Sequence, residues 1–463
     1  MTALVAASLV AVVLTTPLAA WAQAEHAVTP GQLEGRPALE GTSPLQARVD
    51  AAAPGARLEV AAGTYVGDLY IDRPVTLVGI GRPRLVGSGG GSVVRVRADH
   101  VTIEGFDIDG QRGGDLGRDS SGVHVAAKWV TIRDVSVVES LFGIYLREAD
   151  GAVVERCRIR GIAGRDPGEK GSGIHAYNTV AFRFDDNEID DVRDGLLLQN
   201  ASRGRISRNR VSDVRYGLHY MFSDDNIFEG NTFERGAAGS AIMYSERIQF
   251  RRNRFLRNRG FASVGLLLQQ CDDVLAEDNL IADNARGVFL EGTHRVTFRR
   301  NVVAGSDAAL VMFDSAMETR IEGNLFIGNL SPLNMVGKRS DAFVSGNYWS
   351  ENVEPDLDGD GISDRPYRLS SVFDHFRGNL TAADLMADGF AGAALGAAET
   401  AFPILDPAPM VDQAPLARAP RLDHVPAANP TSRANRLTVL ASAAVSVGAA
   451  VVLVGGRRAR RLP

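Results

Sequence analysis

The chain has 463 residues, a formal net charge of −6, and 45% hydrophobic residues. This length is enough for one large folded body with appended segments. The negative charge argues against nucleic acid as a partner, because nucleic-acid-binding domains present a basic stripe, and two cysteines are too few for a disulfide framework.

The N-terminus carries an apolar stretch at residues 3–20, followed by WAQA with small-residue cleavage sites at Ala22 or Ala24. This pattern is typical of a secretory signal peptide, although the usual basic residue before the apolar run is absent. We therefore expect residues 1–24 to be a signal peptide that directs export. Residues 25–54 are expected to form an N-terminal segment before the main fold.

A repeat of about 22 residues then dominates the chain. Its markers are eight asparagines: Asn187, Asn209, Asn231, Asn253, Asn279, Asn301, Asn324 and Asn347. A glycine precedes most of them by 14 positions, and both residues sit in short apolar runs without helical periodicity. This pattern is typical of a solenoid in which each repeat is one coil. It predicts an all-β fold, a right-handed parallel β-helix over residues 55–350.

The repeated glycines and asparagines are expected to occupy left-handed corners of the coils, because both residue types tolerate positive φ. Stacked asparagine amides are also expected to hydrogen-bond from coil to coil. Extra residues after Asn253 and around Arg165–Lys170 should loop out of the rod. Cys157 and Cys271 lie about five coils apart, too far for a disulfide, and are expected to be small core or turn residues.

Three side chains in consecutive coils are candidates for a metal site. By strand alternation, His219 and Met221 should face outwards, and Met243, 22 residues after Met221, should lie beside it on the next strand. An imidazole and two thioethers on a solvent-facing patch suit Cu(I). Alternatively, the methionines pack with Phe222 and Tyr244 as an apolar stripe for a protein partner, and the two interpretations are compatible.

His124, Tyr145 and His175 fall at the same outward position on earlier coils. His175 and His219 are two coils apart, which is too far for one mononuclear site. We expect these histidines to be solvated surface residues.

Residues 351–367 contain DLDGDGISDRP, which matches the start of a calcium-binding loop and predicts a clamp on the last coil. The bidentate glutamate of a full EF-hand is missing, since its position holds tyrosine. An Asp/Gly turn with solvated charges is the alternative. The candidate calcium ligands are Asp356, Asp358, Asp360, the main-chain oxygen of Ile362, and Asp364.

A catalytic role is an alternative, because many β-helices cleave or epimerise polysaccharides with clustered carboxylates. Acidic pairs recur just before the second strand of a coil, a turn position that indicates architecture. These pairs are Asp185–Asp186, Asp224–Asp225 and Asp272–Asp273. The sequence shows no nucleophile–base pairing, phosphate loop or zinc spacing.

The C-terminal part is expected to leave the solenoid. Residues 368–435 form a helical patch and a Pro-rich tether. Residues 437–456 are uncharged and apolar, long enough for one transmembrane helix, and the basic residues 457–463 should stay cytoplasmic. A sorting tail that is removed is the alternative. The rod would thus stand on the outer face of the inner membrane.

The chain resembles the NosD-type periplasmic maturation proteins of nitrous-oxide reductase, within the carbohydrate-binding and sugar-hydrolase β-helix group. The resemblance depends on LEVAAGTYVGDLYIDRPVTLVGIGRP, RYGLHYMFSDDNIFEGN, AIMYSERIQFRRNRF and GNYWSENVEPDLDGDGISDRPY. The HYM and MYS motifs of the family fall on residues 219–221 and 243–245. The C-terminal span departs from typical soluble members.

This resemblance implies a non-enzymatic protein that acts in assembly of copper centres. Its implied partners are an ABC transporter ATPase and permease, a copper-donor lipoprotein and the nitrous-oxide reductase apoprotein. Copper is the implied transient ligand. The alternative function is a secreted β-helix protein that binds or cleaves polysaccharide.

Overall fold

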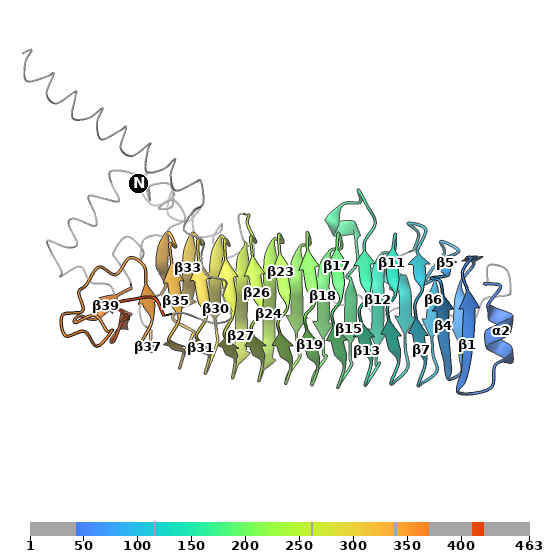
Figure 1. Cartoon of the computed structure of the whole chain (residues 1–463), viewed down its shortest axis with the longest axis horizontal. Coiled ribbons are helices and arrows are strands. Elements are labelled where there is room, and N and C mark those ends of the chain that lie inside the picture. Colours follow the sequence, from blue (N-terminus) through green and yellow to red (C-terminus); the bar gives the residue numbers. More distant parts are fainter. Residues whose placement is uncertain (1–42, 115, 261–262, 338–339, 370–409, 421–463) are drawn as a thin grey trace, which may run out of the picture. The chain divides into compact units, whose positions relative to one another are not determined.

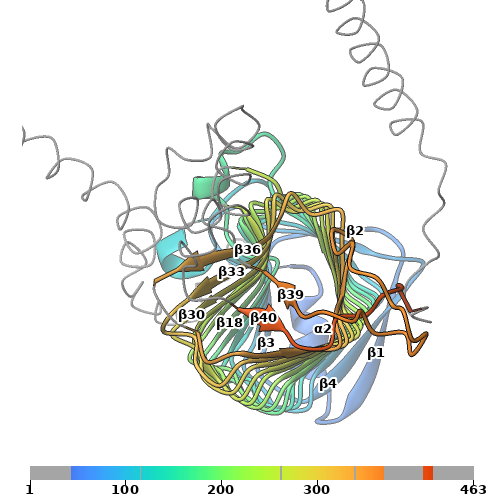
Figure 2. The ribbon, with the colours of Figure 1, turned by 90° about the vertical axis from the view of Figure 1, so that its left-hand side faces the viewer.

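The computed structural model describes residues 43–369 and 410–420, apart from residues 115, 261–262 and 338–339. In this part the chain forms a parallel β-solenoid of about 13 coils, with strands stacked along its axis (Figure 1). Three parallel sheets enclose one continuous hydrophobic core (Figure 2). The predicted all-β parallel solenoid is therefore confirmed.

Each coil gives one strand to each sheet, except that the last coil of the described part gives none to sheet 3. Sheet 1 consists of β1 (Ala56–Ala61), β4 (Val75–Ile80), β7 (Thr102–Glu104), β10 (Thr131–Arg133), β13 (Val153–Glu155), β16 (Arg183–Asp185), β19 (Arg205–Ser207), β22 (Ile227–Glu229), β25 (Gln249–Arg251), β28 (Leu275–Glu277), β31 (Thr297–Arg299), β34 (Arg320–Glu322) and β37 (Phe343–Ser345). Sheet 2 consists of β2 (Thr64–Val66), β5 (Arg84–Val86), β8 (Asp107–Asp109), β11 (Ser136–Val138), β14 (Arg158–Arg160), β17 (Glu188–Asp190), β20 (Arg210–Ser212), β23 (Thr232–Glu234), β26 (Arg254–Leu256), β29 (Leu280–Ala282), β32 (Val302–Ala304), β35 (Leu325–Ile327) and β38 (Tyr348–Trp349). Sheet 3 consists of β3 (Leu69–Ile71), β6 (Val94–Val96), β9 (Ser121–Val125), β12 (Phe142–Arg147), β15 (Ile174–Tyr177), β18 (Asp194–Gln199), β21 (Tyr216–Met221), β24 (Ala238–Glu246), β27 (Val264–Asp272), β30 (Arg286–Glu291), β33 (Ala308–Phe313) and β36 (Ser331–Val336).

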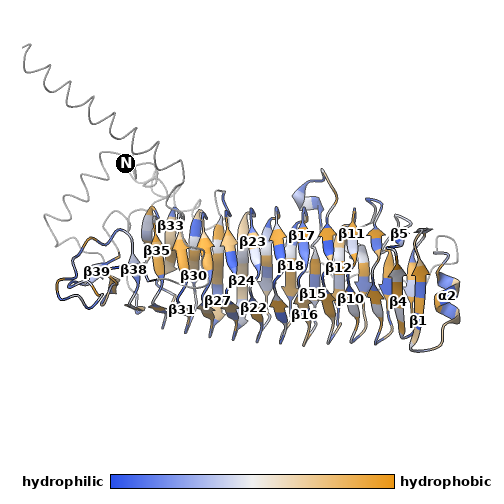
Figure 3. Ribbon diagram, in the orientation of Figure 1, coloured by the Kyte–Doolittle hydropathy of each residue, from blue (hydrophilic) through white to orange (hydrophobic). Residues whose placement is uncertain are grey.

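The core is built from the residues that alternation turns inwards. In the three-residue strands of sheets 1 and 2, the middle side chain is buried and the flanking ones are mostly polar. Aromatic side chains stack from coil to coil, as Phe228 does on Phe250 and Phe326 does on Trp349, with ring centroids 5.0 and 4.0 Å apart. Apolar colour therefore follows the strands, while the corners and loops are hydrophilic (Figure 3).

The asparagine ladder forms the predicted hydrogen bonds along the axis. Asn209 Oδ1 accepts from both the backbone N and Nδ2 of Asn187, at 3.0 and 2.8 Å. Asn231 Oδ1 then accepts the same pair of bonds from Asn209. The pattern continues through Asn347, and every ladder side chain is buried. These amides satisfy backbone donors at a corner that no strand ladder reaches.

The prediction that glycine and asparagine supply the left-handed corners is wrong at the repeated positions. The ladder asparagines and the repeated glycines have ordinary φ, whereas the residue just before an asparagine, such as Asp186 or Arg208, has φ of 56° or 54°. The repeated glycines are needed for space instead. A Cβ on Gly195 would lie 2.1 Å from Val211 Cγ1 and 2.7 Å from Gly217 O. Close approach of successive coils therefore selects glycine there.

Short elements close both ends of the solenoid. At the N-terminal end, α2 (Gln46–Ala51) buries Val49 on the core, and its Gln46 side chain bonds the backbone N and O of Tyr70 on β3. At the C-terminal end, β39 (Tyr367–Arg368) and β40 (Val411–Asp412) form an antiparallel pair, and Leu369 and Met410 are buried beside them. These caps cover sheet edges that would otherwise be open.

Two 3₁₀ turns lie in loops, η1 (Leu116–Arg118) and η2 (Pro167–Glu169). The η2 turn falls in the predicted insertion at Arg165–Lys170, and its loop projects from the solenoid (Figure 1). Within the described residues, no helix is long and apolar enough to cross a membrane. The predicted signal peptide (1–24), most of the tether, the span (437–456) and the basic tail (457–463) lie outside the described residues.

Candidate functional site

The candidate copper residues lie on the outer face of sheet 3. The strand register pairs Met221 on β21 with Met243 on β24, as the 22-residue repeat predicts. His219 also lies on this face, since its neighbours Leu218 and Tyr220 belong to the inner core. The predicted exposure is wrong, because His219 is 2% exposed and Met243 is 8% exposed. Only Met221 is partly open to solvent.

A buried carboxylate holds His219 in place. Asp194, on the preceding strand β18, lies 3.1 Å from His219 Nδ1 and receives two hydrogen bonds from Arg215, at 2.9 and 2.7 Å. Burial alone would raise the pKa of Asp194, but the bonds from His219 and Arg215 outweigh it and hold that pKa well below its usual range. The ionised carboxylate therefore favours a proton on Nδ1. A carboxylate on one ring nitrogen is the arrangement that orients many metal-binding histidines.

The earlier outward histidines are also buried, which corrects their assignment as solvated residues. His124 and His175 contact the ring of Tyr145 between them, with centroids 4.9 and 4.6 Å apart. Leu116 and Ile162, from the loops that carry η1 and η2, pack on the same cluster. These side-chain contacts bury a face that strand alternation predicts to be open.

Burial keeps both histidines neutral. Burial, together with the charges of nearby arginines, lowers the pKa of His124 to about 4 and that of His175 to about 3. His124 Nε2 and both ring nitrogens of His175 are buried without a hydrogen-bond partner. The ring of Tyr145 between them keeps the two imidazoles from converging on one ion.

The acidic pairs are structural, as the sequence indicated. Arg208, one coil on from Asp186, donates two hydrogen bonds to its carboxylate, both at 2.8 Å. Arg247 clamps Asp225 and Arg295 clamps Asp273 in the same way. Hydrogen bonds from these arginines lower the pKa of all three carboxyl groups. Carboxylates held ionised in this way are poor general acids.

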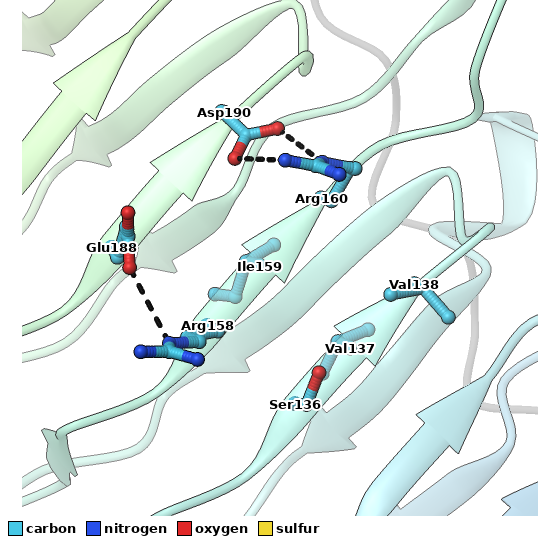
Figure 4. Close-up of a pocket in the computed structure, with 8 residues that line it drawn as sticks. All are labelled: Ser136, Val137, Val138, Arg158, Ile159, Arg160, Glu188 and Asp190. Atoms are coloured by element: carbon cyan, nitrogen blue, oxygen red, sulfur yellow. Dashed lines mark hydrogen bonds and ion pairs between the residues drawn. The ribbon is translucent and has the colours of Figure 1, made fainter.

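A hollow on the surface of sheet 2 is also lined by paired charges. It has a volume of about 390 Å³ and is lined by residues of β11, β14 and β17 (Figure 4). Arg158 pairs with Glu188 at 3.4 Å and Arg160 with Asp190 at 2.6 Å. Each of these charges has an opposite partner, so the hollow presents no unpaired carboxylate for acid–base chemistry.

The candidate calcium loop brings part of its predicted ligand set together. Oxygens of Asp356, Asp358 and Asp360 lie within 4.8 Å of one another. Gly361 has φ of 88°, which allows the sharp turn after them. Asp364 Oδ2 instead accepts from Leu357 N at 2.8 Å.

The loop is fixed to the end of the solenoid through the segment after β40. Ile362 forms a β-bridge with Leu416, and Ala417 N donates to Gly361 O at 3.0 Å. Ser363 N donates to Pro415 O at 2.8 Å. The turn therefore keeps its position through main-chain bonds. Each of the three clustered carboxylates also accepts backbone hydrogen bonds inside the loop, and the remaining lone pairs of their oxygens are of the kind that a hard cation takes as ligands.

Sequence analysis missed two buried carboxylates. Asp194 lies just before the repeated Gly195. Its partners Arg215 and His219 come from the next coil, and no residue pattern near Asp194 indicates these contacts. Asp412 Oδ2 accepts from Asn347 N, Asn347 Nδ2 and Trp349 Nε1, at 3.0, 2.9 and 3.0 Å, and so ends the ladder. It is 65 residues from Asn347 in the chain. Both cysteines are free and buried, in agreement with their prediction.

Comparison with known proteins places these features in context. Residues 160–367, which include both candidate metal sites, match a family model described as "Periplasmic copper-binding protein (NosD)". A Pseudomonas aeruginosa protein named "Probable ABC transporter binding protein NosD" is 27% identical over 423 residues, covering 80% of this chain and 90% of that protein. A Stutzerimonas stutzeri protein of the same name is 25% identical, covering 79% and 87%.

Among solved structures, the chain is similar to the A-module of a mannuronan C-5 epimerase from Azotobacter vinelandii. The TM-score is 0.52 and the identity 16%, over 65% of this chain and 93% of that module. At this identity the likeness shows the shared β-solenoid fold alone.

Proposed function

We propose that this chain, which matches the NosD family model over residues 160–367 and two relatives of that name, is a NosD-type protein: a non-enzymatic periplasmic accessory protein for assembly of the copper centres of nitrous-oxide reductase. The family description supports copper binding and a periplasmic location. The names of the two relatives support association with an ABC transporter. A copper-donor lipoprotein and the reductase apoprotein are the further partners of this proposal.

The observation that carries the copper assignment is the pairing of Met221 with Met243 on adjacent strands. Two thioethers at this spacing are soft ligands suited to Cu(I), which can be held transiently and passed on. His219, oriented by Asp194, is the third candidate ligand on the same face. The limited exposure of this face favours a site that opens or exchanges copper when a partner binds.

Cu(I) titration of the purified protein tests this assignment. The double variant Met221→Leu and Met243→Leu keeps apolar volume but removes both sulfur atoms. We expect it to lower Cu(I) affinity at least tenfold, with an unchanged melting temperature. A matched control is Met317→Leu, an exposed methionine on a different coil. Equal Cu(I) affinities for the double variant and the wild type would remove the methionine pair from the proposal.

The Asp-rich loop is proposed as a structural calcium site. Its three clustered carboxylates support this assignment, and main-chain bonds already attach the loop to the segment that follows β40. Calcium there would neutralise three like charges and tighten the C-terminal cap.

Membrane attachment through residues 437–456 is also part of the proposal and depends on the sequence alone. The alternative of a polysaccharide-cleaving enzyme is disfavoured, since the paired carboxylates are clamped by arginines. Release of unsaturated or reducing ends from uronate polymers would revive that alternative.

A further inference from the structure

Two aromatic side chains occupy an unusual place at one corner of the solenoid. Phe222 and Tyr244 follow directly after the paired methionines and have φ of 51° and 52°. On neighbouring coils the residue at the same position is Asn178, Asn200 or Gln270, with φ between 49° and 50°. Asparagine tolerates this left-handed conformation, whereas a bulky aromatic residue adopts it rarely.

The fold gives no packing reason for these aromatic residues. Phe222 is 52% exposed and Tyr244 is 41% exposed. Their rings stack on each other at 5.2 Å with an interplanar angle of 14°, and both side chains stay about half exposed in the stack. A strained backbone that carries half-exposed aromatic side chains points to a binding role.

The surface beside the stack is acidic. A shallow hollow of about 730 Å³ adjoins Tyr244 and is lined by Asp224, Glu246, Asp272, His294 and Met317. Asp225 and Asp273 are adjacent to these residues in the chain. Arg247 and Arg295 form ion pairs with the carboxylates, and Arg203 lies near Asp225. Five carboxylates against three guanidinium groups leave a net charge of −2 at this corner.

We infer that this corner is a docking surface for a protein partner that presents an arginine or lysine side chain. A guanidinium group stacks favourably on an aromatic face, and the carboxylate of Asp224, which forms none of the ion pairs that the described residues make at this corner, lies on the same side to neutralise it. Stacked aromatic residues beside charged groups are typical anchors of protein interfaces.

This inference rests on the proposed function, because it names the surface where copper is exchanged. Phe222 and Tyr244 are the next residues after Met221 and Met243, so a partner seated on the stack would lie beside the thioethers. A neutral sugar ring would also stack on the aromatic faces, but it would not use the negative charge of the hollow.

The test measures binding of the full-length protein to the purified reductase apoprotein and to the purified copper donor, each from the same organism. The double variant Phe222→Asn/Tyr244→Asn places asparagine at both corners, which is the residue type that Asn178 and Asn200 supply at the same position on earlier coils. It therefore keeps the left-handed corner and should fold with an unchanged or higher melting temperature. We expect it to weaken binding of at least one partner tenfold or more. Binding should also weaken as salt is raised from low to physiological concentration.

Trp129→Ala is the matched control. Trp129 is 52% exposed, has φ of 53° and stacks on His100, but it lies on an earlier coil away from the acidic hollow. This variant should bind both partners like the wild type. The charge variant Asp224→Lys should weaken binding as the double variant does.

Docking and copper binding are separable in these measurements. The asparagine variant should keep the wild-type Cu(I) affinity, whereas the methionine-to-leucine variant should lose it and still dock. Wild-type affinity of the asparagine variant for both partners would overturn the inference, as would a failure of the wild type to bind either. Binding of a uronate oligosaccharide that is lost in the asparagine variant would assign the corner to sugar instead.

Discussion

Replacement of Asp412 by alanine would open the C-terminal end of the solenoid. The Asp412 side chain is fully buried and accepts hydrogen bonds from Asn347 and from the indole of Trp349. It also accepts from the backbone N of Gly346 and Ala414, both at 3.1 Å. Among the residues that the structure describes, no further coil follows to supply an asparagine oxygen, so these donors depend on this one carboxylate.

The expected loss follows from the donors that are left unpaired. Asn347 Nδ2 keeps its bond to Ile321 O at 2.9 Å, and water can reach the partly buried N of Gly346. Asn347 N and Trp349 Nε1 remain buried and unpaired. At ~1–3 kcal/mol each, they give a loss of about 2–6 kcal/mol in the stability of the cap. The Asp412→Asn variant can place its one oxygen at the Oδ2 position and so keep both buried donors paired, and its loss should therefore be smaller than that of Asp412→Ala.

Tryptophan fluorescence measures this loss locally. Trp349 is fully buried, whereas Trp129 is half-exposed, so a Trp129→Phe background isolates the buried indole among the described residues. In Asp412→Ala, we expect the emission of Trp349 to shift to longer wavelength at a lower urea concentration than the bulk loss of β-structure seen by circular dichroism. The ends of a solenoid can open before its middle because each coil contacts only its neighbours.

The reasoning would be refuted if the fluorescence and circular-dichroism transitions of Asp412→Ala coincided and its free energy of unfolding lay within about 0.5 kcal/mol of that of the wild type. Such a result would mean that Asp412 does not terminate the asparagine ladder in solution.

Three further predictions address the ladder, the buried histidines and the Asp-rich loop. Asn231→Ala leaves the buried backbone N of Asn209 unpaired, although Asn209 Nδ2 keeps its bond to Phe184 O, and should lower the free energy of unfolding by about 1–3 kcal/mol; a change below 0.5 kcal/mol in urea unfolding would contradict it. Because burial lowers the pKa of His175 to about 3, the unfolded chain takes up a proton first as the pH falls below about 6.5. The free energy of unfolding should therefore fall between pH 6.5 and 4. The variant His175→Leu carries the residue type of Leu197, its partner on the next strand, and should flatten the dependence of the melting temperature on pH in this range. An identical slope in the variant and the wild type would contradict this prediction. Finally, calcium should raise the melting temperature of the wild type and not that of the double variant Asp358→Ala/Asp360→Ala. If a chelator changed both melting temperatures equally, the loop would be a turn without a calcium site.

The register of the solenoid was predictable because the repeat length is nearly constant. Once Asn209 and Asn231 are one coil apart, the positions of Met221 and Met243 on adjacent strands follow without further information. The same arithmetic predicted that stacked amides bond along the axis. The repeat length stays recognisable along the chain even where individual positions of the repeat hold different residues.

Exposure was not predictable from the same pattern. Alternation places His219 and His175 on the outer face, but what covers that face comes from segments without periodicity. Ile162, in the loop that carries η2, packs on the histidine cluster although nothing in its neighbourhood indicates this contact. The partnership of Asp412 with Asn347 spans 65 residues and depends on how the chain returns to the solenoid.

The repeated glycines show that a residue type can be predicted for the wrong reason. Gly195 recurs because a side chain would collide with Val211 and with the backbone of the next coil. The left-handed corners are taken by residues such as Arg208, whose guanidinium gains a bidentate partner in Asp186. Steric crowding between coils becomes visible only when their backbones are placed.

The central claim is that the paired methionines serve the assembly of copper centres in nitrous-oxide reductase. The most direct measurement is the copper content and activity of the reductase purified from a deletion strain that carries either the wild-type gene or Met221→Leu/Met243→Leu. We expect the wild type to restore full copper occupancy, and the variant, present at the same level in the periplasm, to leave the reductase deficient in copper. Full copper occupancy with the variant would contradict the claim.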